Sequence, residues 1–561
     1  MFNKKIIILI FTLLLYQSSL LSKSTSFDEF NSKNLSKYFS GIVAFENKDN
    51  SVALEFFKSS KILINQHDPH LEKFVMSLVL EDKVAQAINI IKTNGKKSNS
   101  DFFEAYILLA LDSLKKNNID KATKILAEVP DYLQKDRFNF IILNSLKQYS
   151  NVFKNKKIQK GNQNFGSLSL ITETFQRCYL NDENTGSFFS ELINNSQADY
   201  SRYIYFYLTY LIDKNQIEEA KVITDELNYI NTTLLLSQGK SWIERNEYKE
   251  FGKVFSCSNH NDILGEFLFL ISNLYSSKNE FEKSNFYLSL SSYSNPKFVF
   301  NLSLVAENLY LNENYKKSKN VLKNFYQNQD FYYWYRSKKE AQIIAKISNQ
   351  KEALNYITSK FDEIKNPNNK FIFDIANFYK NSKEYDQAIK YYSLIINSLD
   401  EDSVVKADLL YRRGASFERL KDYSSADKDL LHSLKIDPGD AYVLNYLAYS
   451  WLERDYKINK AIEMLEKSYT QENNDPYIID SIGWAYYLID DFIKAEKFLK
   501  RAVQLMPYDP IVNDHYGDIL WKLDRKIQAR YFWLMVLEME DAEQELIDQI
   551  NNKLIDGPKN S

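Results

Sequence analysis

The chain is poor in the residues that make tight turns and reactive sites. Its 561 residues include only 13 Gly, 9 Pro, 2 Cys and 5 His. Because Gly and Pro supply most tight turns, their scarcity argues against a fold rich in hairpins and favours long helices. The scarcity of His leaves little of the commonest general base, and two cysteines cannot make a disulfide-rich scaffold.

The sequence also lacks the short motifs of common enzymes. It has no Gly-rich phosphate loop, no Gly-x-Gly-x-x-Gly, no Cys-x-x-Cys and no zinc-protease helix motif. His67 and His70 in HDPH flank a proline, so we expect a surface loop and not a metal site. His515, between Asp514 and Tyr516, is expected to be a partly exposed helix residue and not a catalytic base. We therefore predict a protein that is not an enzyme and uses no cofactor or metal.

The charges are nearly balanced, with 71 Lys and Arg against 74 Asp and Glu and a net charge of −3. Nucleic-acid binding needs a one-sided positive field, so no nucleic-acid partner is predicted. Hydrophobic residues make up 44% and aromatic residues 15% of the chain, which is enough apolar surface for a folded core.

The N-terminus, MFNKKIIILIFTLLLYQSSLLSKS, has the order of a secretory signal peptide. Lys4 and Lys5 precede an apolar run from Ile6 to Tyr16, and small residues follow. This run is too short to span comfortably a hydrocarbon layer of about 30 Å. We expect a signal peptide at 1–24, a periplasmic or otherwise exported protein, and no transmembrane span in the mature form. Cleavage of the signal and association with a membrane stay open.

The C-terminal part of the sequence has a period of about 34 residues. The stretch PYIIDSIGWAYYLIDDFIKAEKFLKRAVQLMPYD, from Pro476, contains two amphipathic segments with a polar break between them, as in two antiparallel helices. Gly483, Ala495 and Ala502 stand where these helices approach closely, and Pro507 ends the second one. The small residues recur at Gly414, Ala448, Gly483 and Gly517, with alanines at 426, 461, 495 and 529. This recurrence indicates stacked helix pairs.

At these positions the chain resembles the tetratricopeptide repeat (TPR) family. The repeat at 407–440 has Leu410, Gly414, Phe417, Ala426, Leu430 and Pro438, with Ser433 in place of an alanine, and the repeat at 476–509 matches every position of the pattern. The stretches LNYLAYSWLERD and VNDHYGDILWKLDRKIQAR are similar to secreted proteobacterial TPR proteins. The resemblance implies an all-α solenoid, a right-handed superhelix of stacked antiparallel helix pairs.

The repeat pattern divides the mature chain into segments. We predict divergent helical repeats at 25–150, an irregular seam at 151–198, divergent TPR-like repeats at 199–365, clear TPR repeats at 366–540, and a capping helix with a tail at 541–561. Cys178 and Cys257 are expected to be buried and unpaired, with a disulfide between them as the alternative that an exported protein permits.

In TPR proteins, positions 2, 5, 9, 12 and 13 of each repeat face a concave groove. Carried over to the last three repeats, these positions predict a partner-binding groove of aromatic and acidic side chains, made of Tyr442, Asn445, Tyr449, Tyr477, Asp480, Trp484, Tyr487, Asp514, Asp518, Trp521 and Lys522. Such a groove suits a peptide bearing Lys or Arg, or a sugar stacked on the rings.

The resemblance and the N-terminus together predict a non-enzymatic scaffold or adaptor of the bacterial cell envelope that binds proteins or peptides. The alternative is an accessory subunit that positions substrate for a peptidoglycan- or polysaccharide-processing enzyme, with an envelope glycan or its enzymes as partners. The identity of the partner and the oligomeric state stay open.

Overall fold

The computed structural model describes residues 31–558 except 66, 95–100, 162, 195–200, 228–229, 231, 327–329 and 402. The predicted signal peptide therefore lies outside the described residues. The described residues form α-helices and short 3-10 helices and contain no β-strand, so the all-α prediction is confirmed. None of the helices in this described part is both long and apolar enough to cross a membrane.

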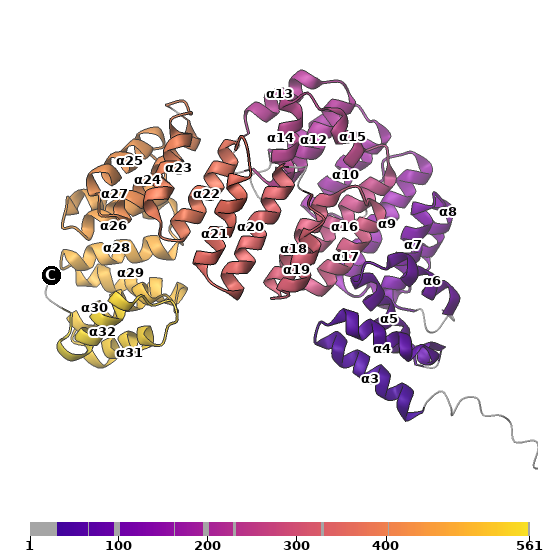
Figure 1. Ribbon diagram of the computed structural model, residues 1–561, viewed down its shortest axis with the longest axis horizontal. Coiled ribbons are helices and arrows are strands. Elements are labelled where there is room, and N and C mark those ends of the chain that lie inside the picture. Colours follow the sequence, from indigo (N-terminus) through magenta and orange to yellow (C-terminus); the bar gives the residue numbers. More distant parts are fainter. Residues whose placement is uncertain are drawn as a thin grey trace, which may run out of the picture. The chain divides into compact units, whose positions relative to one another are not determined.

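The chain forms two compact units (Figure 1). Unit 1 contains the described residues up to Leu227 and Thr232–Ile343, and unit 2 contains the described residues of Asn228–Asn231 and those from Ile344 onward. The boundary lies inside the predicted segment 199–365. The helix α20 (Asp330–Ile347) runs across it.

The helices of unit 1 are α3 (Ser32–Glu46), α4 (Asn50–Ser59), α5 (Asp68–Leu80), α6 (Val84–Asn94), α7 (Phe103–Lys115), α8 (Ile119–Ala127), α9 (Arg137–Asn155), α10 (Ser167–Leu180), α11 (Thr185–Ile193), α12 (Ser201–Asp213), α13 (Ile217–Asp225), α14 (Leu234–Glu244), α15 (Lys249–Val254), α16 (His260–Ser276), α17 (Phe281–Ser294), α18 (Leu302–Leu311) and α19 (Tyr315–Leu322), with 3-10 turns η1 (Lys61–Asn65), η2 (Asp131–Gln134) and η3 (Val299–Asn301). The helices of unit 2 are α21 (Gln350–Asp362), α22 (Asn369–Asn381), α23 (Tyr385–Ile396), α24 (Val404–Arg419), α25 (Tyr423–Ile436), α26 (Ala441–Leu452), α27 (Ile458–Gln471), α28 (Pro476–Leu488), α29 (Phe492–Leu505), α30 (Pro510–Lys522), α31 (Lys526–Leu537) and α32 (Gln544–Asp556).

One kind of tight turn joins helix pairs in both units. Asp82, Asn117, Asn279, Asp490 and Asp524 each stand at such a turn in the left-handed conformation, with φ between 56° and 61°. The chain then bonds back to the end of the first helix, as in a Schellman-type cap that satisfies carbonyls left free there. The turns at 82, 117 and 279 lie in the part of the sequence where the TPR signature is weak. The same kind of turn therefore joins helices in that part of the chain as well as in the clear repeats.

Within each pair, a small residue on the first helix faces a large residue sixteen positions later on the second. A Cβ atom added at Gly483 would lie 2.8 Å from the side chain of Leu499 and 3.1 Å from its backbone nitrogen. A Cβ at Gly414 would lie 3.0 Å from Leu430. These distances leave no room for a larger side chain, so the prediction that the glycines mark close helix contact is confirmed.

Ser433, which replaces the alanine of the TPR pattern, is accommodated by a hydrogen bond. Its hydroxyl donates to the carbonyl oxygen of Ala407 at 2.8 Å, and the side chain is buried. The buried hydroxyl is therefore satisfied, and the substitution does not leave an unpaired polar group in the pair.

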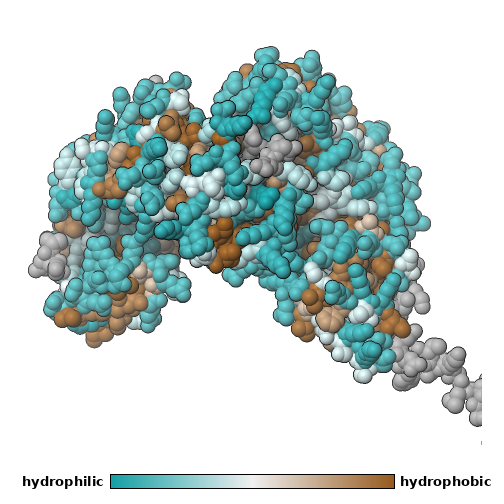
Figure 2. Space-filling view, in the orientation of Figure 1, coloured by the Kyte–Doolittle hydropathy of each residue, from teal (hydrophilic) through white to brown (hydrophobic). Residues whose placement is uncertain are grey.

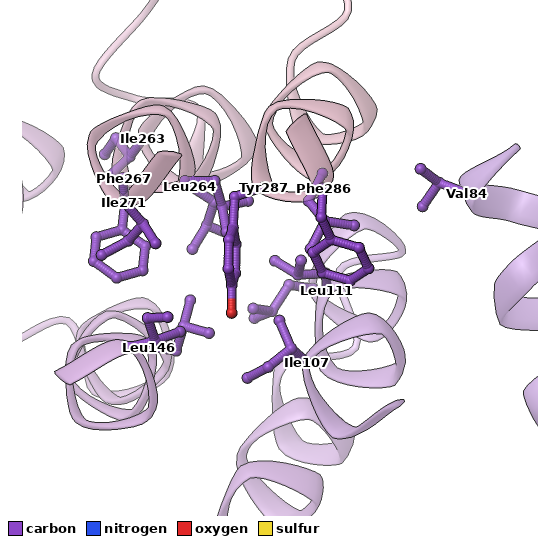
Figure 3. Packing of buried hydrophobic residues seen from close by; sticks show 14 of the residues in the cluster. Val84, Ile107, Leu111, Leu146, Ile263, Leu264, Phe267, Ile271, Phe286 and Tyr287 are labelled. Carbon is purple, nitrogen blue, oxygen red and sulfur yellow. The ribbon is translucent and has the colours of Figure 1, made fainter. Parts of the chain in front are cut away.

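Unit 1 has a core built from helices that are far apart in the sequence. Figure 3 shows Phe286 and Tyr287 of α17 beside Ile107 and Leu111 of α7, with Leu146 of α9 on the other side. All five side chains are buried. The helices α7 and α17 are separated by more than 160 residues, so unit 1 folds back on itself and does not depend on neighbouring repeats alone.

A disulfide joins Cys178 at the end of α10 to Cys257 between α15 and α16, with the two Cα atoms 5.5 Å apart. The expectation of unpaired cysteines is therefore wrong. The sequence could not reveal the pairing, because the bridge connects positions 79 residues apart in a region without a clear repeat. The helices α10 and α11 lie within the predicted irregular seam at 151–198, and the described irregular backbone before α10 lies between Lys156 and Gly166.

Candidate functional site

The predicted groove residues lie on the first helices of three consecutive pairs of unit 2, namely α26, α28 and α30. The second helices, α27, α29 and α31, pack behind them through the small residues described above. This packing holds the three first helices side by side, each in contact with the next, and so brings the predicted residues into one row of repeats.

Two of the predicted residues are open to solvent. Tyr442 and Tyr477 occupy the same position of consecutive repeats, and their side chains are 53% and 56% exposed. Ile511, at that position of the next repeat, is 44% exposed. Sequence reasoning missed Ile511, although the spacing that identified the two tyrosines could have found it. Together these three residues form an exposed row, which we call the apolar row.

The rings of Tyr487, Trp484 and His515 form a continuous stack. The Trp484 and Tyr487 centroids are 4.7 Å apart, and the Trp484 and His515 centroids are 4.1 Å apart, with nearly parallel planes in both pairs. Tyr487 and His515 are buried. The expectation that His515 is partly exposed is therefore wrong, and Tyr487 packs inside the stack of repeats.

The carboxylates of Asp480 and Glu453 bind two rings of the stack. Nδ1 of His515 lies 2.8 Å from Oδ2 of Asp480, and the indole N–H of Trp484 donates to Glu453 at 3.2 Å. Burial lowers the pKa of His515, but the charges of Asp480 and the neighbouring carboxylates outweigh burial, so its pKa is raised. A raised pKa favours a charged imidazolium paired with Asp480. Asp480 is thus a buried partner of the next repeat and not an open acidic rung.

The acidic residues of the last repeat are covered by the C-terminal helix. Nζ of Lys553 on α32 lies 2.7 and 2.8 Å from the two carboxylate oxygens of Asp514 and 2.8 Å from Oδ2 of Asp518. Both aspartates are buried. We call these three residues the lysine clasp. Lys553 was missed by sequence reasoning because nothing in its local sequence indicates a partner 35 and 39 residues away.

Burial and mutual repulsion strongly perturb the lysine clasp. Burial and the charge of Asp514 raise the pKa of Asp518 to about 7, although Lys553 acts against this shift. Burial lowers the pKa of Lys553, but the two aspartates outweigh it and raise that pKa. Oδ1 of Asp518 is buried without a hydrogen-bond partner in the described part of the chain. Asp518 is therefore less well satisfied by Lys553 than Asp514, which accepts from it through both carboxylate oxygens.

The remaining predicted residues are distributed along the same row of repeats. Trp521 touches the C-terminal segment, because a Cβ added at Gly557 would collide with its indole. Nζ of Lys522 lies 5.9 Å from the ring centroid of Tyr487. Oδ1 of Asn445 is buried without a described hydrogen-bond partner. The Tyr449 ring lies 6.4 Å from His515, near the ring stack.

The preceding repeats add a basic pocket that sequence reasoning missed. Its volume is about 230 Å³, and it is lined by Lys380, Tyr385, Tyr411, Arg412, Ala415, Ser416, Arg419 and Tyr446. Burial and the charge of Arg412 lower the pKa of Lys380. Unit 2 therefore has a basic pocket on its early repeats and buried aspartates on its last repeats.

A family model described as a tetratricopeptide repeat matches residues 370–397 and 407–440. A TPR repeat-containing protein of Pseudomonas aeruginosa is 33% identical over 111 residues, which cover 20% of this chain and 19% of that protein. The match thus spans about a fifth of the length of this relative.

Two solved structures are among those to which parts of this chain are similar. Yeast Tom70 is 13% identical with a TM-score of 0.36, covering 93% of this chain and 94% of that one. MamA of Desulfovibrio magneticus is 19% identical with a TM-score of 0.27, covering 31% of this chain and 97% of that one.

Proposed function

Because this chain carries tetratricopeptide repeats, we propose that it is a non-enzymatic scaffold that binds other proteins of the bacterial cell envelope through unit 2. The apolar row of Tyr442, Tyr477 and Ile511 is the observation that carries this proposal. Exposed aromatic side chains at a regular spacing on rigid helices are effective anchors for a protein or peptide partner, since little entropy is lost when they are covered.

The two tyrosines stand on well-fixed helix ends. Asp440 accepts a hydrogen bond from the backbone N–H of Tyr442 at 2.9 Å, and Asp475 does the same for Tyr477 at 2.9 Å. Such caps hold the first turn of each helix in place.

The envelope location has two independent supports. The N-terminal sequence has the pattern of an export signal. The Cys178–Cys257 disulfide fits an oxidising compartment such as the periplasm, since disulfides are rare in the reducing cytosol. Together they favour a scaffold that works after export.

The second candidate is an accessory subunit that presents a glycan to a peptidoglycan- or polysaccharide-processing enzyme. The exposed rings of Tyr442 and Tyr477 favour it, because sugars stack on aromatic faces. In that case the captured partners would include the enzyme, and binding of a soluble glycan fragment would depend on the same two tyrosines.

The test compares two double variants of the full chain. Tyr442→Ala with Tyr477→Ala removes the apolar row, whereas Tyr508→Ala with Tyr531→Ala removes two other exposed tyrosines of the same unit. Trp484 and Tyr487 are unsuitable targets because they pack in the ring stack. After crosslinking in the native envelope, we expect the first variant to lose its partners at least tenfold, in line with about 2 kcal/mol for an anchor residue. An equal loss in both variants, or none in either, would contradict the proposal.

A further inference from the structure

The helix α32 covers the acidic residues of the last repeat but buries little apolar surface of its own. Its buried side chains are Leu546 and Ile550, Leu554 packs partly buried against the same core, and Ile555 is 76% exposed. A helix of thirteen residues held by so few apolar side chains gains little from burial against the entropy lost when its backbone is ordered. Such an element belongs to the part of a fold that opens first.

The main polar attachment of α32 is the lysine clasp. Lys553 meets both buried aspartates, and the side chain of Arg530 on α31 donates to the carbonyl oxygen of Leu554 at 3.3 Å. At the other end of the helix, Glu543 pairs with Lys383 at 2.9 Å. That second pair is exposed, with both side chains more than 70% accessible, so solvent screens it.

The lysine clasp repeats an arrangement found one repeat earlier. Asp480 and Asp514 occupy the same position of consecutive repeats, and each pairs with a cationic side chain from the second helix after its own. For Asp480 this cation is His515 on α30, and for Asp514 it is Lys553 on α32. The last repeat therefore has a surface that binds a helix carrying a cationic side chain, and α32 occupies this surface.

The charges of α32 match those of unit 2 along its length. Its acidic N-terminal end, at Glu543, meets Lys383 and lies near Arg419, which adds to the lowering of the Glu543 pKa caused chiefly by Lys383. Its lysine meets the aspartates. Between the two ends, Leu546 and Ile550 are four residues apart and point to one face, as expected of an amphipathic helix. The pattern is Glu-x-x-Leu-x-x-x-Ile-x-x-Lys.

We propose that α32 is a built-in occupant of the last repeat and that a protein partner binds there by presenting a helix of the same pattern, an acid followed by two apolar residues and a lysine or arginine, in place of α32. This inference rests on the proposed function, because it names the class of partner that unit 2 binds. The partner must compete with a segment of the same chain, so its apparent affinity is reduced by the fraction of time that α32 stays seated.

An unsatisfied carboxylate oxygen at the site supports an exchange of occupants. Lys553 leaves Oδ1 of Asp518 buried without a hydrogen-bond partner in the described residues. An arginine carries five N–H donors in a planar fork and can satisfy more carboxylate oxygens than a lysine. A partner helix can therefore make contacts that α32 does not make.

The experiment uses the full chain and a fluorescent synthetic peptide of residues 541–558. Lys553→Glu in the chain places two buried aspartates against a third negative charge and releases α32. We expect the peptide to bind this variant at least tenfold more tightly than the unaltered chain, because the competing segment is gone. Lys500→Glu, the same charge change on an exposed position of α29, is the control and should bind the peptide as the unaltered chain does.

Two further measurements keep the outcome clear. Hydrogen exchange should show fast exchange in α32 of the Lys553→Glu variant with unchanged protection in α28. If the melting temperature of the Lys553→Glu variant falls by more than the loss of α32 alone explains, the milder Lys553→Gln variant is used in its place. A peptide carrying the Lys553→Glu change should not bind.

The proposal is overturned if the unaltered chain and the variant bind the peptide equally, or if α32 stays protected in the variant. These failures are separate from failure of the proposed function. If the peptide does not bind but the tyrosine double variant still loses its partners, unit 2 is a scaffold and only the exchange of α32 is wrong.

Discussion

The two units solve the same packing problem in different ways. In unit 2, each helix pair contacts mainly the next pair, and a small residue facing a large one sets the distance between helices. In unit 1, helices from the beginning and the end of the unit share one core, and a disulfide connects positions 79 residues apart. A repeat that packs only on its neighbours must keep its pattern, whereas a repeat with partners elsewhere can lose it.

A buried ion pair in unit 1 joins helices that are far apart in the sequence. The guanidinium of Arg202 on α12 donates to both carboxylate oxygens of Glu266 on α16, at 2.8 and 2.6 Å, and to Asn301 at 2.9 Å. It also lies 3.7 Å from the ring centroid of Phe269. These partners lie 64 and 99 residues from Arg202, so they hold together parts of unit 1 that no repeat period relates.

The largest expected difference between the units comes from the disulfide. Replacing Cys178 and Cys257 by serine should lower the free energy of unfolding of unit 1 by about 4 kcal/mol, since the bridge closes a long loop of the unfolded chain. Unit 2 contains no part of this bridge and should unfold as before. Calorimetry with and without reductant would resolve the two transitions. An equal shift of both would show that the units do not unfold independently.

A smaller effect is expected from the glycines of unit 2. Gly483→Leu should overpack the pair α28 and α29 and lower the free energy of unfolding by about 1–3 kcal/mol. Gly252 in unit 1 is the matched control, because a Cβ there meets nothing within 4 Å. Gly252→Leu should leave stability nearly unchanged. Urea denaturation measures both, and a similar cost at the two glycines would refute the idea that close contact is specific to the repeat positions.

The smallest effect is a pH dependence of the lysine clasp. The pKa of Asp518 is raised from 3.8 to about 7, and that of His515 is raised above 6.5. At pH values between the unfolded and the folded pKa of each group, the folded chain therefore binds more protons than the unfolded chain. Stability from these groups is present at low pH and is lost as pH rises through this window. We expect the free energy of unfolding of unit 2 to fall by about 1 kcal/mol between pH 5 and 8. This corresponds to roughly one pKa unit, which is less than the full shift of Asp518, because Asp514 and Lys553 share the titration.

Asp518→Asn tests the origin of this pH dependence. The amide cannot titrate, so the slope of stability against pH should become shallower, and the variant should be at least as stable as the unaltered chain at pH 8. A slope that stays the same would assign the effect to other groups. Thermal melts at several pH values measure it.

The sequence predicts the parts of this protein that depend on local rules. The positions of Gly414 and Gly483 against Leu430 and Leu499 follow from a period of about 34 residues, and the same period singles out Tyr442 and Tyr477, which are exposed. Local rules do not extend to the lysine clasp. Charged residues usually lie in solvent, so the sequence predicts that Asp514 and Asp518 line an open groove. Only the position of Lys553 in the fold shows that they are buried.

The same reasoning explains the errors at His515 and at the cysteines. A helix histidine between acidic residues is usually solvated, and here it stacks on Trp484 and pairs with Asp480, both on α28 of the preceding repeat. Cys178 and Cys257 lie where the repeat period is lost, so their approach depends on the fold of unit 1 as a whole. For the cysteines the deciding partner is distant in sequence and follows no period, whereas Asp480, the partner of His515, lies 35 residues away, one repeat earlier.

Native-state hydrogen exchange of the intact chain tests most directly whether unit 1 is one cooperative body while unit 2 opens from its C-terminal helix. We predict that α7, α9, α16 and α17 exchange together with one free energy of opening, and that α32 exchanges well before α28 and α30. Protection of α32 equal to that of α28, or separate openings of α7 and α17, would contradict the account.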